Sequence, residues 1–159
     1  MLSFNTHGVL IPGVHTLDWN YFITSYSFSN QRKKLFKGMQ RAFIHFKNAG
    51  CKIIYVDGSF VTKKIIPNDY DACWDMNGVD YNILHPMFHR DLKMGTGIHK
   101  LTFGGEFYPA SHIEGGSGLS FLDFFQTDKM TGRRKGIIKI KLEEVKWLKI
   151  QENITQHPL

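Results

Sequence analysis

Two short apolar runs, separated by a glycine-containing turn, constrain the fold of this chain more than any other feature. The first run covers residues 51–56 and leads into Asp57-Gly58-Ser59, and the second covers residues 70–74. Runs of this length that are bounded by turn residues are typical of buried strands. Because two strands joined by a short connection pack in one layer, the sequence predicts a sheet rather than a helical bundle.

The segments around these two runs predict a mixed α/β fold. Apolar residues recur at three- to four-residue spacing over residues 32–48, which indicates a helix capped by Ser29 or Asn30. Ile138 and Ile140 alternate with lysines, which indicates a half-buried strand. We expect an α/β architecture in the α+β sense: a small mixed sheet flanked by helices, with the functional site at one sheet edge. Further patterns predict an extended arm over residues 1–15, a short helix from Thr16 to Phe22, a helix from Asp80 to about Leu92, and a strand over residues 101–108.

Composition and length fit a single domain that spans residues 1–159. The chain is 42% hydrophobic and 14% aromatic, which argues against disorder. Its 20 Lys and Arg exceed its 14 Asp and Glu, and the net charge of +6 favours polyanionic partners such as nucleotides or RNA. Cys51 and Cys73 lack a metal-binding spacing, and no signal peptide or membrane-spanning stretch is evident. We therefore expect a cytoplasmic protein with reduced cysteines and no membrane association.

Two aspartates beyond the turn indicate a metal site. Nine residues separate Gly58-Ser59 from Asp69 and Asp71. If both aspartates lie in a strand, its two-residue period directs their carboxylates to one face, where they repel each other unless a cation lies between them. Mg²⁺ prefers such oxygen ligands together with substrate phosphates. Because Gly58 lets the backbone approach a phosphate and Ser59 adds a hydroxyl donor, the combination predicts a site for a metal-bound polyphosphate.

This combination resembles the core motif of the nucleotidyltransferases of the DNA polymerase β type. The chain is also similar, over about residues 8–142, to small bacterial and phage-borne proteins of the minimal nucleotidyltransferase kind. The resemblance implies a nucleotidyltransferase-like fold and Mg²⁺- or Mn²⁺-dependent chemistry on an NTP. The segments that carry this similarity are residues 10–15, 55–62, 104–110, 123–128 and 135–138.

The resemblance also implies roles for individual residues. Asp69 and Asp71 would bind the metal ions, and a third carboxylate on a neighbouring strand would complete the site and help to activate the acceptor hydroxyl. Glu106 is the predicted third carboxylate, because it lies in a segment that matches the small family. Three other residues remain alternatives to it: Asp75, Asp123 and Asp128.

Two further residues adjoin the predicted site. Lys64 lies between the phosphate turn and the carboxylates, so we expect it to bind the NTP phosphates together with Gly58 and Ser59; a solvated lysine is the alternative. Asp57 immediately precedes the turn. Alternation along the strand directs its side chain opposite to its neighbours, so we expect it to hold the turn by hydrogen bonding rather than to bind metal.

Three other groups of residues have a plain structural interpretation beside the functional one. A basic cluster fits either phosphate or RNA contacts or an exposed hairpin tip. Two histidines four residues apart lack the glutamate of a zinc-protease motif and have a proline between them, which argues against zinc. An aromatic run fits the core better than a base-stacking platform. These groups are Arg133-Arg134-Lys135, His85 with His89, and Phe121 with Phe124 and Phe125.

The predicted function is transfer of a nucleotidyl group from an NTP to a hydroxyl of RNA, a protein or a small molecule, in a toxin–antitoxin or phage-defence setting. The alternative is a catalytically weak or inactive binding module with this fold, an antitoxin or regulatory subunit acting through a partner protein encoded nearby. The short chain motivates this alternative, because larger members of the superfamily carry an additional domain for the base or the acceptor. A simple RNA-binding protein is the third option.

Overall fold

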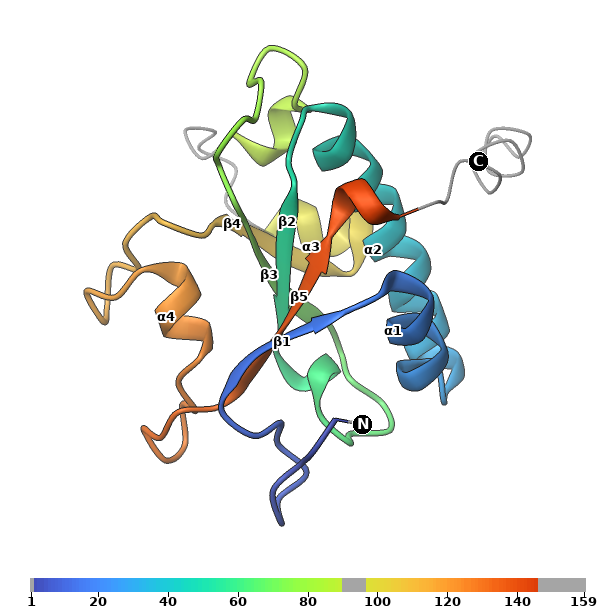
Figure 1. Ribbon diagram of the computed structural model, residues 1–159, viewed down its shortest axis with the longest axis vertical. Coiled ribbons are helices and arrows are strands. Elements are labelled where there is room, and N and C mark those ends of the chain that lie inside the picture. Colours follow the sequence, from blue (N-terminus) through green and yellow to red (C-terminus); the bar gives the residue numbers. More distant parts are fainter. Residues whose placement is uncertain (1, 90–96, 146–159) are drawn as a thin grey trace.

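A five-stranded mixed sheet forms the centre of the computed structural model, which describes residues 2–89 and 97–145 (Figure 1). The strands are β1 (Gly13–Leu17), β2 (Ile53–Asp57), β3 (Tyr70–Trp74), β4 (Gly105–Pro109) and β5 (Gly136–Lys141). They lie in the order β1-β5-β2-β3-β4. The pairs β1/β5 and β3/β4 are parallel, whereas β2 is antiparallel to both of its neighbours, β5 and β3.

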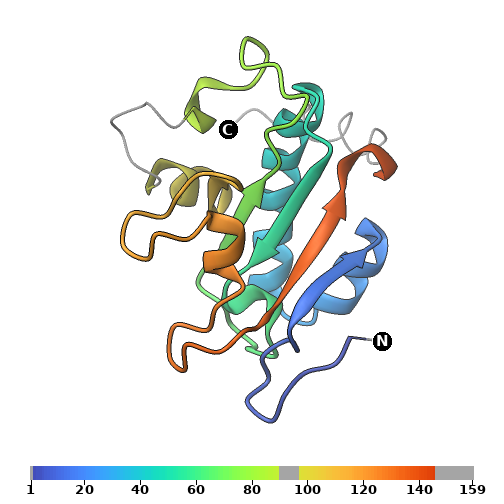
Figure 2. The ribbon, with the colours of Figure 1, turned by 60° about the vertical axis from the view of Figure 1, so that its left-hand side comes forward.

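Helices cover the two faces of the sheet unequally. The helices are α1 (Trp19–Tyr26), α2 (Asn30–Asn48), α3 (Gly97–Phe103) and α4 (Phe121–Phe125), and the 3-10 turns are η1 (Ser59–Val61), η2 (Pro86–Phe88) and η3 (Leu142–Glu144). Figures 1 and 2 show α1, α2 and α3 on one face of the sheet and α4 on the other. The predicted fold class, a small mixed sheet flanked by helices, is confirmed.

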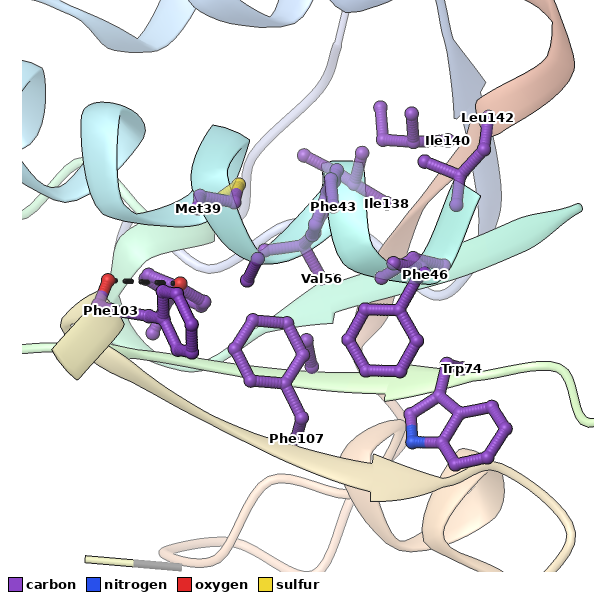
Figure 3. Close-up of a cluster of buried hydrophobic side chains, with 14 of the residues drawn as sticks. Met39, Phe43, Phe46, Val56, Trp74, Phe103, Phe107, Ile138, Ile140 and Leu142 are labelled. Atoms are coloured by element: carbon purple, nitrogen blue, oxygen red, sulfur yellow. Dashed lines mark hydrogen bonds between the residues drawn. The ribbon is translucent and has the colours of Figure 1, made fainter. Parts of the chain in front are cut away.

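The main hydrophobic core lies between α2 and the sheet (Figure 3). Met39, Phe43 and Phe46 project from α2 at three- to four-residue spacing and are fully buried. They pack against alternate strand residues such as Val56 and Phe107. Burial of a side chain of this size contributes about 1.5–3 kcal/mol, so this apolar face fixes the position of α2 on the sheet.

A second, smaller core lies on the face that α4 covers. Cys73, Phe125 and Ile137 are buried in it, and Tyr55 and Tyr108 pack against them. Successive strand residues point to opposite faces, so the strand positions that alternate with the main core belong to this α4 face. Alternate residues of β2, β3 and β5 therefore point to the main core and to the α4 face.

Several predicted features are confirmed. The helix predicted over residues 32–48 is α2, and the hydroxyl of its cap, Ser29, accepts a hydrogen bond from the Arg32 N–H at 3.3 Å. The strands predicted near residues 51–56 and 70–74, and around Ile138 and Ile140, are β2, β3 and β5. Both cysteines are buried free thiols. Among the described residues, no helix combines the length and the apolar character needed to cross a membrane.

One prediction for the N-terminal region is wrong. Thr16 does not cap a helix but lies in β1, where it pairs with Lys139 of β5. The cap of α1 is Asp18, whose carboxylate accepts hydrogen bonds from the N–H groups of Asn20 and Tyr21 at 2.9 and 3.1 Å. The expected extended arm therefore ends in a strand, because β5, more than 100 residues away in sequence, supplies its backbone partners.

Two predictions between residues 80 and 108 are also wrong. Residues 80–89 form turns and the short η2 instead of a helix, since Pro86 cannot donate a helical hydrogen bond; residues 90–92 lie outside the described residues. Residues 101–103 belong to α3 rather than to a strand. Gly104 ends this helix with a φ of 83°, so β4 begins only at Gly105.

Candidate functional site

Three carboxylates lie side by side at one end of the central strands. Asp57 of β2 is the register partner of Asp71 of β3, and Asp71 is in turn the register partner of Glu106 of β4. All three belong to the α4 face, because their neighbours Val56 and Phe107 point into the main core. The sequence predicts a site at one edge of the sheet. In the structure, the three carboxylates lie on one face of the sheet, near the ends of β2, β3 and β4.

Asp57 points to the face opposite to that of its neighbour Val56, as alternation along the strand predicts. Its side chain points to the same face as Asp71, since residues directly opposite in paired strands share a face. It is 2% exposed, and its Oδ2 accepts a hydrogen bond from the ammonium of Lys135 at 2.8 Å. Its Oδ1 is buried without a hydrogen-bond partner among the described residues. Burial raises the pKa of Asp57, while the charge of Lys135 opposes this rise.

Asp69 reaches the same site from a loop. The strand β3 begins at Tyr70, so Asp69 lies just before it rather than in it, yet Asp69 and Asp71 both line one cavity. The carboxylate of Asp69 forms an ion pair with Lys100 of α3, and the two side chains are 28% and 49% exposed. The predicted aspartate pair is thus brought together, with one member already partnered by a lysine.

Gly58 places the phosphate turn directly against Asp71. Its φ of 84° lies in the left-handed region that disfavours other residues. A Cβ at this position would lie 2.9 Å from Asp71 Oδ2 and 3.2 Å from the Asp71 backbone nitrogen. Ser59 follows as the first residue of η1, and its carbonyl accepts a hydrogen bond from the Thr62 hydroxyl at 2.7 Å. The turn and the acidic strand end therefore form one compact unit.

A buried arginine holds the loop that joins this turn to the aspartates. The guanidinium of Arg32 donates hydrogen bonds to the carbonyl oxygens of Phe60, Thr62 and Lys64 at 2.6 to 2.8 Å. The side chain is fully buried, and burial lowers its pKa to about 10, so it stays charged near neutral pH. Sequence reasoning missed Arg32, because in a helix rich in lysine and arginine nothing in the pattern separates it from solvated neighbours.

A cavity of about 380 Å³ lies over these residues on the α4 face. The strand ends, the turn and the segment after α4 form its walls. Glu106 and Lys64 do not line it within the described part of the chain: Glu106 borders Asp71 and accepts a hydrogen bond from the Tyr108 hydroxyl at 3.1 Å, and Lys64 is exposed. Its lining residues include Asp57, Gly58, Ser59, Asp69, Asp71, Phe124, Phe125, Thr127, Asp128, Lys129, Met130 and Lys135.

The electrostatics of the cavity centre on Asp71. Burial, together with the charges of Asp57, Asp69 and Glu106, raises the pKa of Asp71 from 3.8 to about 6, and Lys129 opposes the rise. Within the described residues, no lysine or arginine lies within ion-pair distance of Asp71. A crowded, partly buried carboxylate without a cationic partner favours a nearby positive charge. As arranged, no three His, Cys, Asp or Glu groups of the described residues converge on a metal position.

The alternatives to Glu106 occupy different places. Asp75 lies beyond the far end of β3, beside Tyr55, and Asp123 of α4 lies 3.8 Å from Arg134. Asp128 does line the cavity, but its carboxylate accepts hydrogen bonds from Met130 and Thr131 of its own turn at 2.9 and 3.0 Å. Glu106 is the one of these four carboxylates that is paired in register with Asp71.

The remaining groups divide between structural and site roles. Lys135 belongs to the site and not to an exposed hairpin tip, since it pairs with buried Asp57. His85 and His89 have separate partners, the Met87 N–H at 3.2 Å and the Leu84 carbonyl at 3.1 Å. Phe121 stacks on Tyr108 with ring centroids 4.3 Å apart, and Phe125 is buried in the second core; Phe124 also borders the cavity.

The fold and the site together define a mixed α/β protein with an acidic cavity at the ends of its central strands. The chain belongs to DUF6932, described as a family of unknown function, whose model matches residues 2–141. No curated protein and no solved structure matches the chain. A functional assignment therefore depends on the residues and the geometry of the cavity.

Proposed function

We propose that this protein is a nucleotidyltransferase that uses Mg²⁺ or Mn²⁺ to transfer a nucleotidyl group from an NTP to a hydroxyl acceptor. The observation that carries the proposal is the register alignment of Asp57, Asp71 and Glu106 on three adjacent strands, beside the glycine turn. The resemblance to the polymerase β-type enzymes implies a glycine-serine turn, a paired aspartate motif and a third carboxylate on a neighbouring strand. The positions of Gly58-Ser59, of Asp69 with Asp71, and of Glu106 beside Asp71 support the proposal.

The residues have distinct tasks in the proposed reaction. The acceptor oxygen forms a bond to the α-phosphorus, the bond to the bridging oxygen breaks, and pyrophosphate leaves. Asp69 and Asp71 would hold the metal with the NTP phosphates, and Gly58 and Ser59 would position those phosphates. A bound divalent ion would lower the pKa of the acceptor hydroxyl and stabilise charge on the pyrophosphate. Glu106, next to Asp71, would accept the acceptor's proton.

The size of the cavity supports a nucleotide ligand. At about 380 Å³ it lies in the range of small-molecule sites, and Lys129 and Lys135 bring positive charge to its lining. Such lysines fit an NTP polyphosphate, for which they are common partners. The acceptor would have to enter from the open side, so the proposal includes RNA, a protein or a small molecule as the acceptor.

Labelled nucleotides test the proposal. The protein is incubated with each α-labelled NTP, Mg²⁺ or Mn²⁺, and total cell RNA and protein. We expect one fraction to become labelled, and we expect chelation or the Asp69→Ala/Asp71→Ala double variant to abolish labelling. Glu143→Gln, an exposed change in η3, is the control and should leave labelling intact. Full activity of the double variant would exclude this mechanism.

A second candidate is a binding module that keeps the fold and acts through a partner protein, as an antitoxin or regulatory subunit does. The observation that favours it is the pairing of two site carboxylates with the chain's own lysines, Asp69 with Lys100 and Asp57 with Lys135. Such pairs neutralise a site that a catalytic metal would otherwise occupy. A co-purifying partner protein, together with no NTP turnover in the labelling experiment, would favour this candidate.

A further inference from the structure

A second cavity lies where the start of the chain, α1 and the loop after η1 meet. Its volume of about 260 Å³ is below the range of sites that enclose a whole drug-sized ligand, so it suits one flat ring whose substituents stay outside. Half of its lining residues are aromatic, and none is Asp or Glu. We call it the aromatic pocket; its lining includes Phe4, Tyr21, Tyr26, Phe28, Thr62 and Lys63.

Phe28 offers this pocket an aromatic ring that is supported from behind. The buried guanidinium of Arg32 lies over the ring, 4.2 Å from its centroid. Because Arg32 covers one face and Phe28 is still 52% exposed, the other face is available for stacking. Tyr21, which is 45% exposed, lines the same pocket. Exposed rings beside positive charge are the usual platform for the bases of single-stranded nucleic acids.

Lys63 supplies the positive charge of the aromatic pocket. Its ammonium lies 5.4 Å from the centroid of the Phe4 ring, and in the part of the chain that the structure describes no carboxylate lies within ion-pair distance of it. Its backbone is tied to the start of the chain, because its N–H donates a hydrogen bond to the Gly8 carbonyl at 3.1 Å. A fixed, exposed ammonium of this kind fits a phosphate group.

Tyr26 adds a hydrogen-bond donor to the same pocket. The side chain is 2% exposed, and its hydroxyl is buried without a hydrogen-bond partner among the described residues. Burial raises the pKa of Tyr26, so the hydroxyl stays protonated at neutral pH. A buried polar group without a partner is costly, and an acceptor on a ligand would remove that cost.

We propose that the aromatic pocket binds a nucleotide, with its base among the aromatic side chains and its phosphate at Lys63. The base stacks on the open face of Phe28, an acceptor on its edge takes the hydrogen bond of Tyr26, and the phosphate stays at the mouth of the pocket. A free nucleoside monophosphate and one unit of a single-stranded RNA offer the same chemistry. This second site goes beyond the proposed function and does not depend on it.

The aromatic pocket and the acidic cavity are neighbours that differ in charge. Thr62 lines both of them, so the loop after η1 lies between the two. Four aspartates line the acidic cavity, whereas no carboxylate lines the aromatic pocket within the described residues. Without a divalent metal, the phosphate of a nucleotide is therefore better placed at Lys63 than among the aspartates. Removal of metal ions consequently separates the two sites in a binding experiment.

Metal-free binding of two probes tests the proposal. Adenosine monophosphate and a fluorescent single-stranded RNA of about ten nucleotides are titrated into the full chain in EDTA, followed by calorimetry and by fluorescence anisotropy. Phe28→Ala should weaken binding at least about fivefold, the loss of one stacked base. Lys63→Met should also weaken it and should lower the slope of log affinity against log salt for the RNA by about 0.7.

Two matched variants control for these changes. Tyr81→Ala removes an aromatic side chain that is 40% exposed and lies outside the pocket. Lys52→Met removes an exposed lysine that precedes β2, whereas the loop with Lys63 follows the other end of that strand. Both variants should bind the two probes as the wild type does.

The relative affinity of the two probes identifies the source of the nucleotide. Similar affinities indicate a site for a free nucleotide, and RNA binding that is tighter by about tenfold or more indicates a site for a strand; either result supports the proposal. Binding of neither probe would overturn it, as would wild-type affinity in both Phe28→Ala and Lys63→Met. If Phe28→Ala does not fold, the exposed change Lys63→Met decides the question.

The Asp69→Ala/Asp71→Ala double variant separates this inference from the proposed function. It should bind both probes as the wild type does, although we expect it to have lost nucleotidyl transfer. Loss of probe binding in this variant would place the nucleotide in the acidic cavity and overturn the inference. Metal-free binding that depends on Phe28 and Lys63, in a protein that labels no acceptor, would support the inference while the proposed function fails.

Discussion

Asp57 at the end of β2 and Asp71 near the start of β3 are direct register partners, so two carboxylates from opposite ends of a thirteen-residue connection meet on one face of the sheet. Only Asp57 has a lysine partner within the described residues. The negative charge of Asp71 is therefore the less compensated of the two, and ionisation of Asp71 should lower the stability of the folded protein.

The stability of the metal-free protein should depend on the protonation of Asp71. Its pKa in the folded protein, about 6, lies above the ordinary value of 3.8, so folding takes up a proton between about pH 4 and pH 6. Stability should therefore decrease as the pH rises through this window. For Asp71→Asn we expect a weaker pH dependence and, near pH 8, a free energy of unfolding up to about 3 kcal/mol above that of the wild type.

Urea denaturation of the metal-free proteins at several pH values measures this effect. Glu143→Gln, which removes a carboxylate from an exposed position, provides the comparison and should follow the wild-type profile. A pH profile of Asp71→Asn parallel to that of the wild type would show that Asp71 ionises normally in the folded protein.

Gly58→Ala should damage both the fold and the site. The backbone at Gly58, with φ 84° and ψ −168°, is one that other residues adopt only at a cost of about 1–3 kcal/mol. The added Cβ would also lie 2.9 Å from Asp71 Oδ2, so the carboxylate must shift. We expect a loss of about 2–3 kcal/mol in unfolding free energy and weaker Mn²⁺ binding.

Gly115→Ala is the control for this change, because a Cβ at Gly115 meets nothing within 4 Å and its φ is not in the left-handed region. Thermal unfolding and Mn²⁺ titration of both variants separate the cost of a lost glycine from the effect on the site. Equal stability and equal Mn²⁺ affinity for the two variants would contradict the close approach of the turn to Asp71.

Arg32→Met should destabilise the loop between the turn and the aspartates. The substitution keeps an apolar stem but leaves the carbonyls of Phe60, Thr62 and Lys64 without their donor. Each lost bond to a charged donor is worth about 1.5–3 kcal/mol, so we expect a total loss of at least about 3 kcal/mol. Lys33→Met, an exposed change in the same helix, should have an effect within about 0.5 kcal/mol.

Chemical denaturation measures this loss, and hydrogen exchange of the amides in residues 60–64 localises it. Faster exchange confined to that loop in Arg32→Met is the expected pattern, since the helix α2 retains its apolar face. Unchanged protection of the loop would mean that the guanidinium contributes little to holding it.

Phe46→Ala should test the main core independently of the site. Phe46 is fully buried in α2, with its ring centroid 5.4 Å from Phe107 and 4.4 Å from Phe88. Truncation of such a side chain typically costs about 3–5 kcal/mol. We expect a loss in this range by urea denaturation, with the number of bound Mn²⁺ ions unchanged in the folded fraction. A loss below about 1 kcal/mol would be incompatible with the close packing of α2.

Local patterns were sufficient for part of this structure. The spacing of apolar residues predicted α2, because a helix of 19 residues presents one face to the core whatever its partner is. The short apolar run at Tyr70–Trp74 predicted β3 with its correct bounds. The same local reasoning selected Gly58, Asp69 and Asp71, which the antiparallel pairing of β2 with β3 then brings together.

Other segments needed partners that are distant in the sequence. Thr16 is in a strand because β5 pairs with it, and no local pattern contains that information. The strand predicted over residues 101–108 was wrong at its start, because its alternation is interrupted at Gly104, where the backbone turns from α3 into β4. In both cases the choice between helix and strand depends on which neighbour supplies hydrogen bonds and apolar contacts.

The sequence by itself determined the fold class, the principal helix and the acidic turn motif, since these depend on periodicity and on residues close together in the chain. Only the tertiary structure decided which charges meet in the cavity. It turned Asp57 toward Asp71, brought Lys135 across 78 positions to pair with it, and placed Glu106 beside Asp71 through β4. The physical reason is that strand register, set by burial of the whole sheet, fixes side-chain neighbours that no local pattern specifies.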